Sequence, residues 1–461
     1  MKKTTFKAPV SKNEYVTLTA VDLTHQGMGV CKVDQYPIFV EGLLVGETAK
    51  IKIIKIGKSF AYGRLMNLIE TSPERVEVMD KAYAQSGIMP LQHLSYQGQL
   101  AFKKQQVENV LQRIAKMPEV PVFDTIGMDQ PYEYRNKAQI PVRSIKGQLE
   151  TGFYRRNSHD LIPMEDFQIQ DPKIDEAIIV VRDLLRKFKI NPYDEENNRG
   201  TIRHIIVRRG YYTKELMIVL VTRTNSLPNK NELVDEIVEA LPETVSVIQN
   251  INSKRTNVIL GRNSTVLFGE DNYTDELLGY TFNISHQSFY QVNPTQTESL
   301  YDKVLEYAEL TGEETVIDAY SGIGTITLAL SKQAKQVYGV EIVASAVENA
   351  KKNAQVNNVE NVSFEVGAAE DVMVEWAKEG RKADVLVVDP PRKGLDERFI
   401  DAALEMQPER IVYVSCNPST LARDLKLFAE GGYTVEKAQP VDLFPQTIHI
   451  ETVVSLKRTE N

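Results

Sequence analysis

Apolar and polar residues alternate along the first 70 or so residues of the chain. Residues 15–19, 37–40 and 48–53 carry apolar side chains at about every second position, and glycines separate these runs. A period of two is typical of strands that bury one face. Five or so short strands in so few residues predict a small β-barrel of the oligonucleotide-binding type at residues 1–70.

The next part of the chain mixes helical and strand-like patterns. Residues 96–116 have a strongly helical pattern, whereas apolar runs at residues 205–207 and 217–221 are strand-like. The mixture predicts an α+β central domain at residues 71–288. We expect the helix at residues 96–117 to pack on the C-terminal domain, which begins at residue 289.

From residue 291 onward, apolar runs alternate with helical segments such as residues 345–355 and 420–430. The runs are residues 316–320, 336–340, 385–388 and 411–415. A series of this kind predicts βαβ units, hence a mostly parallel sheet with helices on both faces. The expected fold class is therefore α/β, with a Rossmann-like domain at residues 289–461.

A glycine loop follows the first of these runs. Tyr320 leads into Ser321-Gly322-Ile323-Gly324-Thr325, and glycines let a ligand approach the backbone at a helix N-terminus. The next run ends in Glu341, where an acid can accept hydrogen bonds from both ribose hydroxyls of an adenosine. The loop lacks the third glycine of a dinucleotide site, so it favours S-adenosylmethionine over NAD.

Two further runs end in polar or reactive side chains. Asp389 precedes Pro390-Pro391-Arg392, and Cys416 precedes Asn417-Pro418. A lone cysteine is usually a small buried apolar residue, but Cys416 shares its predicted sheet edge with Asp389 and the glycine loop. The arrangement predicts a nucleophile beside a polar clamp. Methylation of an amino group is disfavoured because no aromatic residue follows the prolines, and cytosine-C5 chemistry would bring a second cysteine.

Basic residues are segregated along a chain whose net charge is -9. That charge argues against indiscriminate nucleic-acid binding. Nevertheless, residues 50–64 contain lysines and no acid, and residues 132–156 and 203–214 interleave basic with aromatic side chains. This pattern suits RNA, whose phosphates need positive charge and whose bases stack on rings. The alternative is that each run is a solvated strand face.

Cys31 and Cys416 are the two cysteines of the chain, and they are far apart in the sequence. They provide neither a disulfide framework nor metal-ligand spacing, which fits a reducing compartment. No run approaches the roughly 20 apolar residues of a membrane span, and the first residues lack an apolar signal region. We expect a cytoplasmic protein with no membrane partner.

Five C-terminal motifs resemble those of the S-adenosylmethionine-dependent RNA uracil-C5 methyltransferases. They are Phe-Tyr-Gln-Val-Asn at 289–293, the loop at 318–325, Asp-Pro-Pro-Arg-Lys-Gly at 389–394, Ser-Cys-Asn-Pro at 415–418 and His-Ile-Glu at 449–451. The first 70 residues also look like the family's TRAM barrel, and residues 134–137 look like its central-domain motif. The resemblance is closest to the branch acting on 23S rRNA at one or two uridines. It implies S-adenosylmethionine as cofactor and RNA as partner, and we expect a monomer.

The resemblance also implies catalytic roles for three residues. Cys416 would add to C6 of uracil, because C5 alone is too weak a nucleophile to accept a methyl group. Asp389 would hydrogen-bond the edge of the base, and Glu451 would remove the C5 proton. Arg392 or Lys393 would lower the pKa of the thiol if either lies close to it. The expected cofactor-binding residues are Gln291, which could instead steady the uracil carbonyl, Tyr320, Gly322, Thr325, Glu341 and Asp389.

The chain departs from many family members at the positions of an iron–sulfur cluster. Counting back from Gln92-His93, the three expected cysteine positions hold Asp80, Ser86 and Met89, and Phe167 is the best match to the fourth. None of these side chains supplies a thiolate, so we expect no cluster and no other metal.

Three other functions remain open from the sequence. The chain could act on a uridine of tRNA instead of 23S rRNA, or it could be a non-catalytic RNA-binding assembly factor. A nicotinamide-dependent oxidoreductase is the third, although it would have no use for Cys416 beside Asp389.

Overall fold

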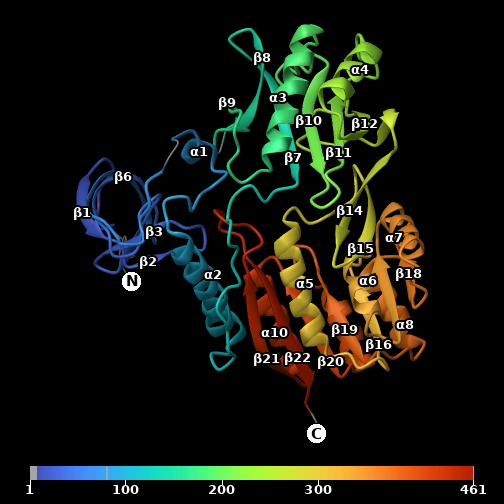
Figure 1. Cartoon of the computed structure of the whole chain (residues 1–461). Coiled ribbons are helices and arrows are strands. Elements are labelled where there is room, and N and C mark those ends of the chain that lie inside the picture. Colours follow the sequence, from blue (N-terminus) through green and yellow to red (C-terminus); the bar gives the residue numbers. More distant parts are fainter. Residues whose placement is uncertain (1–7, 79–80, 157, 460–461) are drawn as a thin grey trace. The chain divides into compact units, whose positions relative to one another are not determined.

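The computed structural model describes residues 8–78, 81–156 and 158–459 (Figure 1). The described residues form two compact units. The first extends to Gln106 and includes residues 444–449, and the second comprises residues 107–443 and 450 onward. Within the described part of the chain, no helix is both long enough and apolar enough to cross a membrane.

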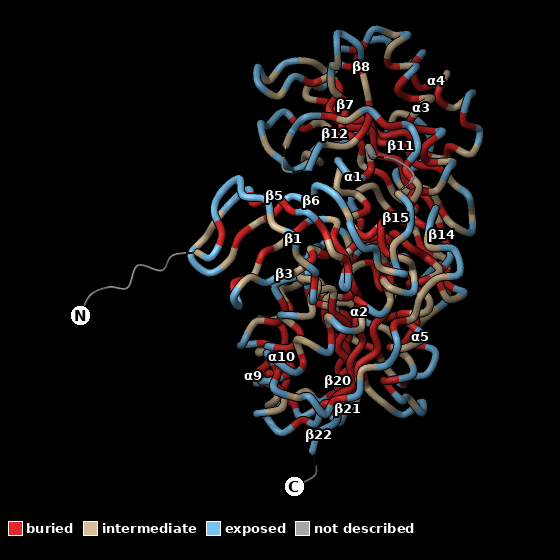
Figure 2. The backbone as a smooth tube through the Cα atoms, turned by 90° about the vertical axis from the view of Figure 1, so that its left-hand side faces the viewer, coloured by how far each residue is buried: buried red, intermediate tan, exposed pale blue. Residues whose placement is uncertain are grey.

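The first unit contains a strongly curved six-stranded sheet with the strand order β1-β5-β6-β4-β3-β2. Apolar residues at alternate positions, among them Cys31, Ile38 and Ile51, fill its core, and the opposite faces are exposed (Figure 2). The predicted barrel is thus confirmed. Its strands are β1 (Tyr15–Thr19), β2 (Asp22–Leu23), β3 (Gly29–Val33), β4 (Tyr36–Val40), β5 (Thr48–Ile56) and β6 (Ala61–Glu70).

Helices follow the barrel in the sequence. α1 spans Lys81–Ser86, and α2 spans Tyr96–Val110 and continues into a π-helical turn at Leu111–Ala115. In the first unit, the Gln99 side chain donates to Gln446 Oε1 at 3.0 Å and accepts from the Gln446 backbone N–H at 2.9 Å. This reciprocal pair fixes residues 444–449 beside the first half of α2.

The second unit begins with a mixed seven-stranded sheet of order β13-β12-β11-β10-β7-β8-β9. Two helices, α3 (Pro172–Lys187) and α4 (Lys230–Ala240), pack beside each other on this sheet. An antiparallel hairpin of β14 (Asn272–Leu277) and β15 (Tyr280–Ser285) follows it. The sheet strands are β7 (Lys137–Ile145), β8 (Gln148–Tyr154), β9 (Leu161–Pro163), β10 (Ile202–Arg209), β11 (Leu216–Thr222), β12 (Thr244–Ile251) and β13 (Asn263–Gly269).

The last part of the second unit is a seven-stranded sheet of order β18-β17-β16-β19-β20-β22-β21. The strands from β18 to β20 in this order are parallel, and β22 is antiparallel to both of its neighbours. The predicted Rossmann-like fold class is therefore confirmed. Its strands are β16 (Thr315–Ala319), β17 (Gln336–Glu341), β18 (Val362–Val366), β19 (Val385–Val388), β20 (Arg410–Ser415), β21 (Tyr433–Val441) and β22 (Glu451–Arg458).

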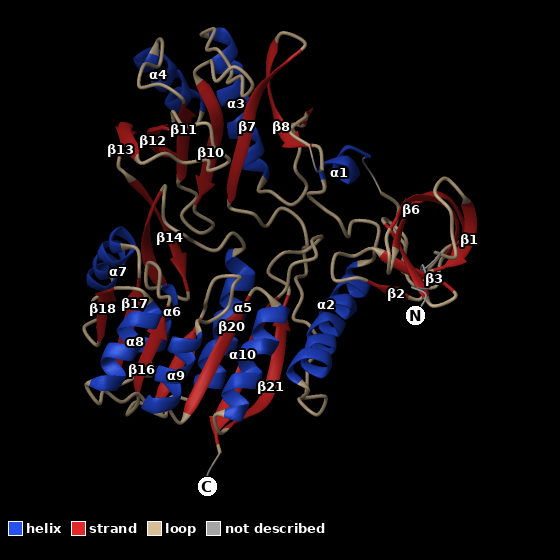
Figure 3. Cartoon of the chain, turned by 180° about the vertical axis from the view of Figure 1, so that it is seen from behind, coloured by secondary structure: helices blue, strands red, loops and turns tan. Residues whose placement is uncertain are grey.

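Two apolar cores cover the two faces of this sheet. Successive residues alternate between them: Ile411 belongs to one core and Val412 to the other. The first core contains α8 (Ala369–Lys378), α9 (Glu397–Met406) and α10 (Pro418–Glu430), and the second contains α5 (Pro294–Ala308), α6 (Thr325–Ser331) and α7 (Ala344–Val356) (Figure 3). Val107, Leu111 and Ala115 join the first core, so the end of α2 packs on this sheet.

Candidate active site

The carboxyl edge of the parallel strands collects the predicted catalytic residues. Asp389 directly follows β19, and Cys416 directly follows β20. Because β22 is antiparallel, its first residue, Glu451, lies at the same edge. Ser415 pairs with Thr452, and continuing that register by one residue places Cys416 opposite Glu451. The edge thus brings together three side chains that the sequence spreads over more than sixty residues.

The glycine loop after β16 has a strained backbone. Tyr320, Gly322 and Gly324 all have positive φ angles, of 70°, 55° and 87°. Only glycine adopts such angles at little cost, so the turn needs its two glycines. Tyr320 adopts a backbone conformation that is unfavourable for a residue with a side chain. The N–H of Gly322 donates to Glu341 Oε2 at 3.1 Å, and the Asn353 side chain donates to the Ile323 carbonyl at 3.1 Å. These two contacts fix the loop from β17 and α7.

Polar groups around the loop fit a nucleoside ligand. Within the described residues, the buried hydroxyl of Ser321 has no hydrogen-bond partner. Glu341 is partly exposed and retains lone pairs beyond those used by Gly322 and Val343. The next residue, Ile342, is apolar and yet 67% exposed. A carboxylate for a ribose and an apolar side chain for a base therefore lie next to each other, as adenosine binding requires.

The catalytic candidates share one electrostatic environment. Burial raises the pKa of Asp389 to about 7, and burial followed by the charge of Asp389 raises the pKa of Glu451 well above its usual value. Glu451 is 5% exposed. Burial, then Glu451 and Asp389, raises the pKa of the Cys416 thiol to about 11. The resting site therefore favours the protonated thiol.

Arg392 lowers the pKa of the Cys416 thiol, which is the direction expected from the sequence. Its positive charge lowers the pKa values of both Cys416 and Glu451, but burial and the carboxylates outweigh it. The Asn417 side chain donates to the Arg392 carbonyl at 2.9 Å. This bond ties the loop after Asp389 to the start of α10, immediately beside Cys416. Lys393 is exposed, and Arg392 is the cation that lowers the pKa of the thiol.

Gln291 lies in the loop between β15 and α5, and the residue is 9% exposed. The Asn136 side chain donates to the Gln291 carbonyl at 3.2 Å, and the Asn136 backbone N–H donates to the Val292 carbonyl at 2.9 Å. Asn293 then caps α5 by accepting from the Gln296 N–H. The central-domain motif at 134–137 thus fixes the loop that carries Gln291.

Two residues at this edge were not assigned roles from the sequence. Tyr301 of α5 hydrogen-bonds Thr325 at 3.0 Å. Burial, with Asp389 and Glu451 among the further causes, raises the pKa of Tyr301. Asp318 is fully buried, accepts from Thr327 at 2.5 Å, and has its pKa raised to about 7, mainly by burial. The sequence does contain a signal for Asp318, because a polar residue interrupts an apolar strand. It contains none for Tyr301, which looks like an ordinary core residue of a helix.

Basic residues of the central sheet gather near the Gln291 loop. Burial, then the charges of Arg208 and Arg135, lowers the pKa of Lys137 to about 7. Arg208 is 4% exposed and donates to the Ser288 carbonyl at 2.7 Å. Its burial contradicts the alternative that residues 203–214 form a solvated strand face. No carboxylate contributes to the Lys137 shift, so this cluster offers positive charge to an anion.

The positions of the missing cluster cysteines are occupied by ordinary contacts. The Ser86 hydroxyl donates to the Tyr83 carbonyl at 2.9 Å, and Met89 and Phe167 are each 2% exposed. Asp80 lies outside the described residues. Among the described residues, no three His, Cys, Asp or Glu side chains are grouped as metal ligands.

Comparisons with known proteins identify the family of the chain. The sequence model of the tRNA (Uracil-5-)-methyltransferase family matches residues 95–459, and that of the TRAM domain matches residues 9–66. An uncharacterized RNA methyltransferase of Enterococcus faecalis is 56% identical over 98% of both chains, and one of Bacillus cereus is 53% identical over 98% of both.

A solved structure also resembles most of the chain. The tRNA (uracil-54, C5)-methyltransferase of Pyrococcus abyssi, in complex with S-adenosyl-L-homocysteine, has a TM-score of 0.77 and 26% identity, covering 95% of this chain and 99% of that one. The chain therefore belongs to the tRNA (Uracil-5-)-methyltransferase family and is an S-adenosylmethionine-dependent RNA uracil-5-methyltransferase with an N-terminal TRAM domain.

Proposed function

We propose that the chain methylates C5 of uridine in 23S rRNA by a covalent route through Cys416. The observation that carries the mechanism is the convergence of Cys416, Glu451 and Asp389 at one sheet edge. S-adenosylmethionine, when bound, supplies the methyl group that C5 receives. The residues expected to hold it are Gln291, Tyr320, Gly322, Thr325, Glu341 and Asp389. RNA of this kind is found in the cytoplasm, where we expect the protein to act.

The first step is addition of the Cys416 thiolate to C6 of the uracil. The S–C6 bond forms as the C5–C6 double bond shifts electrons toward the C4 carbonyl, and this enolate makes C5 nucleophilic. Asp389, protonated near neutral pH, can donate to the edge of the base. A thiol pKa of about 11 means that the thiol must release its proton to water as the substrate complex forms, and Arg392 assists addition by favouring the thiolate.

The last step regenerates the free enzyme. After C5 has accepted the methyl group, it still carries its original proton. Glu451, acting as its carboxylate, takes that proton; the electrons re-form the C5–C6 double bond and the S–C6 bond breaks. Its place opposite Cys416 suits a base that must act on the carbon next to the one attached to sulfur.

The choice of 23S rRNA as the substrate is supported by other observations than those that support the mechanism. The motifs resemble the 23S rRNA branch most closely, and the cations near Gln291 and on the barrel suit a structured RNA. A tRNA uridine is the second candidate, because the Pyrococcus abyssi protein of similar structure is a tRNA (uracil-54, C5)-methyltransferase. Extraction of the uridine from its stack is required in either case.

The test uses the full-length protein, methyl-labelled S-adenosylmethionine, and 23S rRNA or total tRNA from a strain that lacks the gene. We expect one or two 5-methyluridines in 23S rRNA by mass-spectrometric mapping. An RNA with 5-fluorouridine at the mapped site should form a slow-migrating covalent band on a denaturing gel, because fluorine cannot leave as a cation. Labelling of tRNA alone would replace the proposed substrate, and labelling of neither RNA would refute the function.

Two variants separate the proposed steps. Cys416→Ala should abolish methylation and the covalent band, whereas Cys31→Ala, in the barrel core, should retain both. Glu451→Gln should accumulate methylated RNA attached to the protein, because release needs the base. Near-normal turnover by Cys416→Ala would exclude the covalent route. Free turnover by Glu451→Gln would assign the base role to another group.

A further inference from the structure

The central sheet of the second unit contains a cavity of about 340 Å³ that the proposed reaction does not use. It is formed by strands β7, β8 and β10 and by the loops that follow β8, α3 and β12. The chemistry-bearing residues in its lining are Arg143, Tyr154, His159, Glu195, Arg203 and His204. Its volume lies at the lower end of the range for small-ligand sites.

Aromatic rings and guanidinium groups form one wall of this cavity. The rings of Tyr154 and His159 stack at 5.5 Å with an interplanar angle of 26°. The Arg143 guanidinium lies 5.5 Å from the ring centres of both Tyr154 and Tyr193, and it donates to the Tyr154 hydroxyl. The wall is therefore prearranged, and it presents flat π surfaces suited to stacking on a planar ligand.

A single carboxylate faces this basic and aromatic wall. Glu195 Oε2 contacts His159 Nδ1 at 3.1 Å and an Arg143 nitrogen at 3.7 Å. The hydrogen bond from His159 is the first cause that lowers the Glu195 pKa, so the side chain is ionised at neutral pH. Among the described residues, Glu195 Oε1 has no hydrogen-bond donor, and the side chain is 34% exposed. The carboxylate thus retains room for two further donors.

Two residues of the cavity lining, Arg203 and His204, contain buried polar atoms without a hydrogen-bond partner among the described residues. His204 is 8% exposed, and its Nδ1 is buried without a hydrogen-bond partner in the described structure. Arg203 Nε is also buried without a hydrogen-bond partner in the described structure, whereas the terminal nitrogens of Arg203 donate to the carbonyls of Asn252 and Thr256. Because these atoms are enclosed, they do not reach a ligand in the cavity, and the partly exposed carboxylate of Glu195 is the polar group that does.

We propose that this cavity binds a guanine base of the RNA substrate, outside the methylation site. Guanine is the base whose Watson–Crick edge places two donors, N1–H and the 2-amino group, side by side, and a carboxylate accepts both. Adenine and cytosine place a ring acceptor beside their amino group, and uracil offers one donor between two carbonyls. The carboxylate is therefore the group that selects guanine, because Arg143 and Arg203 already donate to the Tyr154 hydroxyl and to backbone carbonyls.

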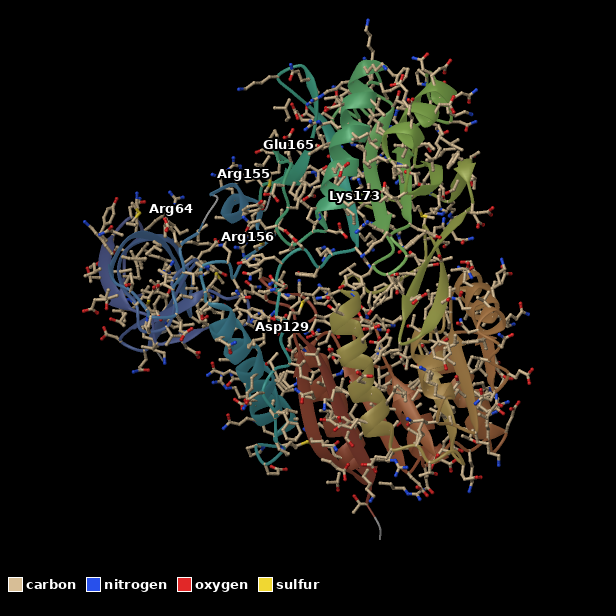
Figure 4. The ribbon with its side chains drawn as sticks, viewed as in Figure 1. Arg64, Asp129, Arg155, Arg156, Glu165 and Lys173 are labelled. Atoms are coloured by element: carbon tan, nitrogen blue, oxygen red, sulfur yellow. The ribbon has the colours of Figure 1, made fainter. Side chains whose placement is uncertain are left out.

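RNA is the source of this base because positive charge continues outside the cavity. Arg155 and Arg156, labelled in Figure 4, follow β8 and are both exposed. They lie shortly before His159 in the sequence, and Arg155 can neutralise a phosphate next to the bound base. The inference rests on the proposed function for the substrate class, but its test does not depend on methyl transfer.

The test compares guanosine and inosine monophosphates, since inosine lacks the 2-amino group. Binding to the full-length protein is measured by ligand-observed NMR at millimolar nucleotide. Wild type should bind the guanine nucleotide about tenfold more tightly than the inosine or adenine nucleotide. Glu195→Gln should remove this preference, and Glu196→Gln, at the adjacent exposed acid, should retain it. Tyr154→Leu should weaken all purine nucleotides, and Phe268→Ala, at an exposed ring on β13, should not.

Methylation provides an independent readout. Glu195→Gln should raise KM for the RNA about tenfold and leave kcat within twofold, because Cys416 and Glu451 are untouched. Equal binding of guanine and inosine nucleotides by wild type, or a preference that survives in Glu195→Gln, would overturn the inference. If wild type methylates no RNA but shows the Glu195-dependent guanine preference, the proposed function fails and the binding site stands.

Discussion

Ser415 of β20 pairs with Thr452 of β22 in an antiparallel ladder. The next position along that ladder places Cys416 opposite Glu451, so a thiol and a carboxyl far apart in the sequence meet at one edge of the sheet. The antiparallel direction of β22 is essential, because a parallel strand would present its first residue at the opposite edge. The topology at the end of the sheet therefore brings the proposed base beside the proposed nucleophile, which follows β20.

The reactivity of Cys416 should respond in opposite directions to its two charged neighbours. Arg392→Gln should slow alkylation of the thiol by iodoacetamide at pH 8.5, because loss of the positive charge raises the thiol pKa. Glu451→Gln should accelerate it, because an opposing carboxyl is removed. A change of threefold to tenfold corresponds to roughly half to one pKa unit.

Mass spectrometry of the alkylated protein measures this reactivity at one position, since Cys31 is fully buried. Cys416→Ala provides the blank, and Lys393→Gln, at the exposed neighbour of Arg392, should react as wild type does. Faster alkylation in Arg392→Gln would show that the arginine does not act on the thiol through its charge.

The sequence predicts the framework of this site well. Val- and Ile-rich runs identify the parallel strands, and the residues after them lie at the carboxyl edge by geometry alone. The surroundings of Glu451 are harder to predict from the sequence. The burial of Glu451 depends on the antiparallel pairing of β21 and β22 at the end of a parallel series of strands. The basic run at 203–214 has the same difficulty: charge predicts exposure, yet β10 is a central strand and His204 and Arg208 are buried.

The purified protein should be colourless and free of iron. Ser86, Met89 and Phe167 cannot donate thiolates, and Cys31 is enclosed in the barrel core. Iron and acid-labile sulfide are measured after anaerobic preparation, together with a visible absorption spectrum. Stoichiometric iron and sulfide with a broad visible absorption band would contradict the prediction. An orthologous family member with the full set of cysteines serves as the positive control.

The barrel lysines should set part of the salt dependence of RNA binding. Lys50 and Lys52 lie 5.2 and 5.7 Å from the ring centre of Tyr15, which groups charge and a stacking surface on one face. Lys50→Gln with Lys52→Gln should reduce the slope of log K against log salt by about 0.7 to 0.9 for each phosphate that is no longer neutralised. Fluorescence anisotropy between low and moderate salt measures the slope. Lys32→Gln, on β3, should leave it unchanged, and an unaltered slope in the double variant would assign the barrel another role.

Asp318 should make the folded protein less stable as the pH rises. Burial raises the pKa of this carboxyl to about 7, well above that of an unfolded aspartate near 3.8. Between these two values the folded state binds more protons than the unfolded state, so the free energy of unfolding decreases with increasing pH in that interval. Asp318→Asn replaces the group with an uncharged one of the same shape, which removes this contribution.

Thermal unfolding of the cofactor-free protein from pH 4.5 to pH 8 measures the effect. Wild type and Asp318→Asn should differ least at pH 4.5, where the aspartate is protonated, and Asp318→Asn should have the higher Tm at pH 8. Asp401→Asn, at an exposed position of α9, should follow wild type throughout. A difference between wild type and Asp318→Asn that stays constant with pH would mean that Asp318 remains ionised in the folded protein. The Thr327 hydroxyl would then have to stabilise a buried charge, because Asp318 Oδ1 has no hydrogen-bond partner among the described residues.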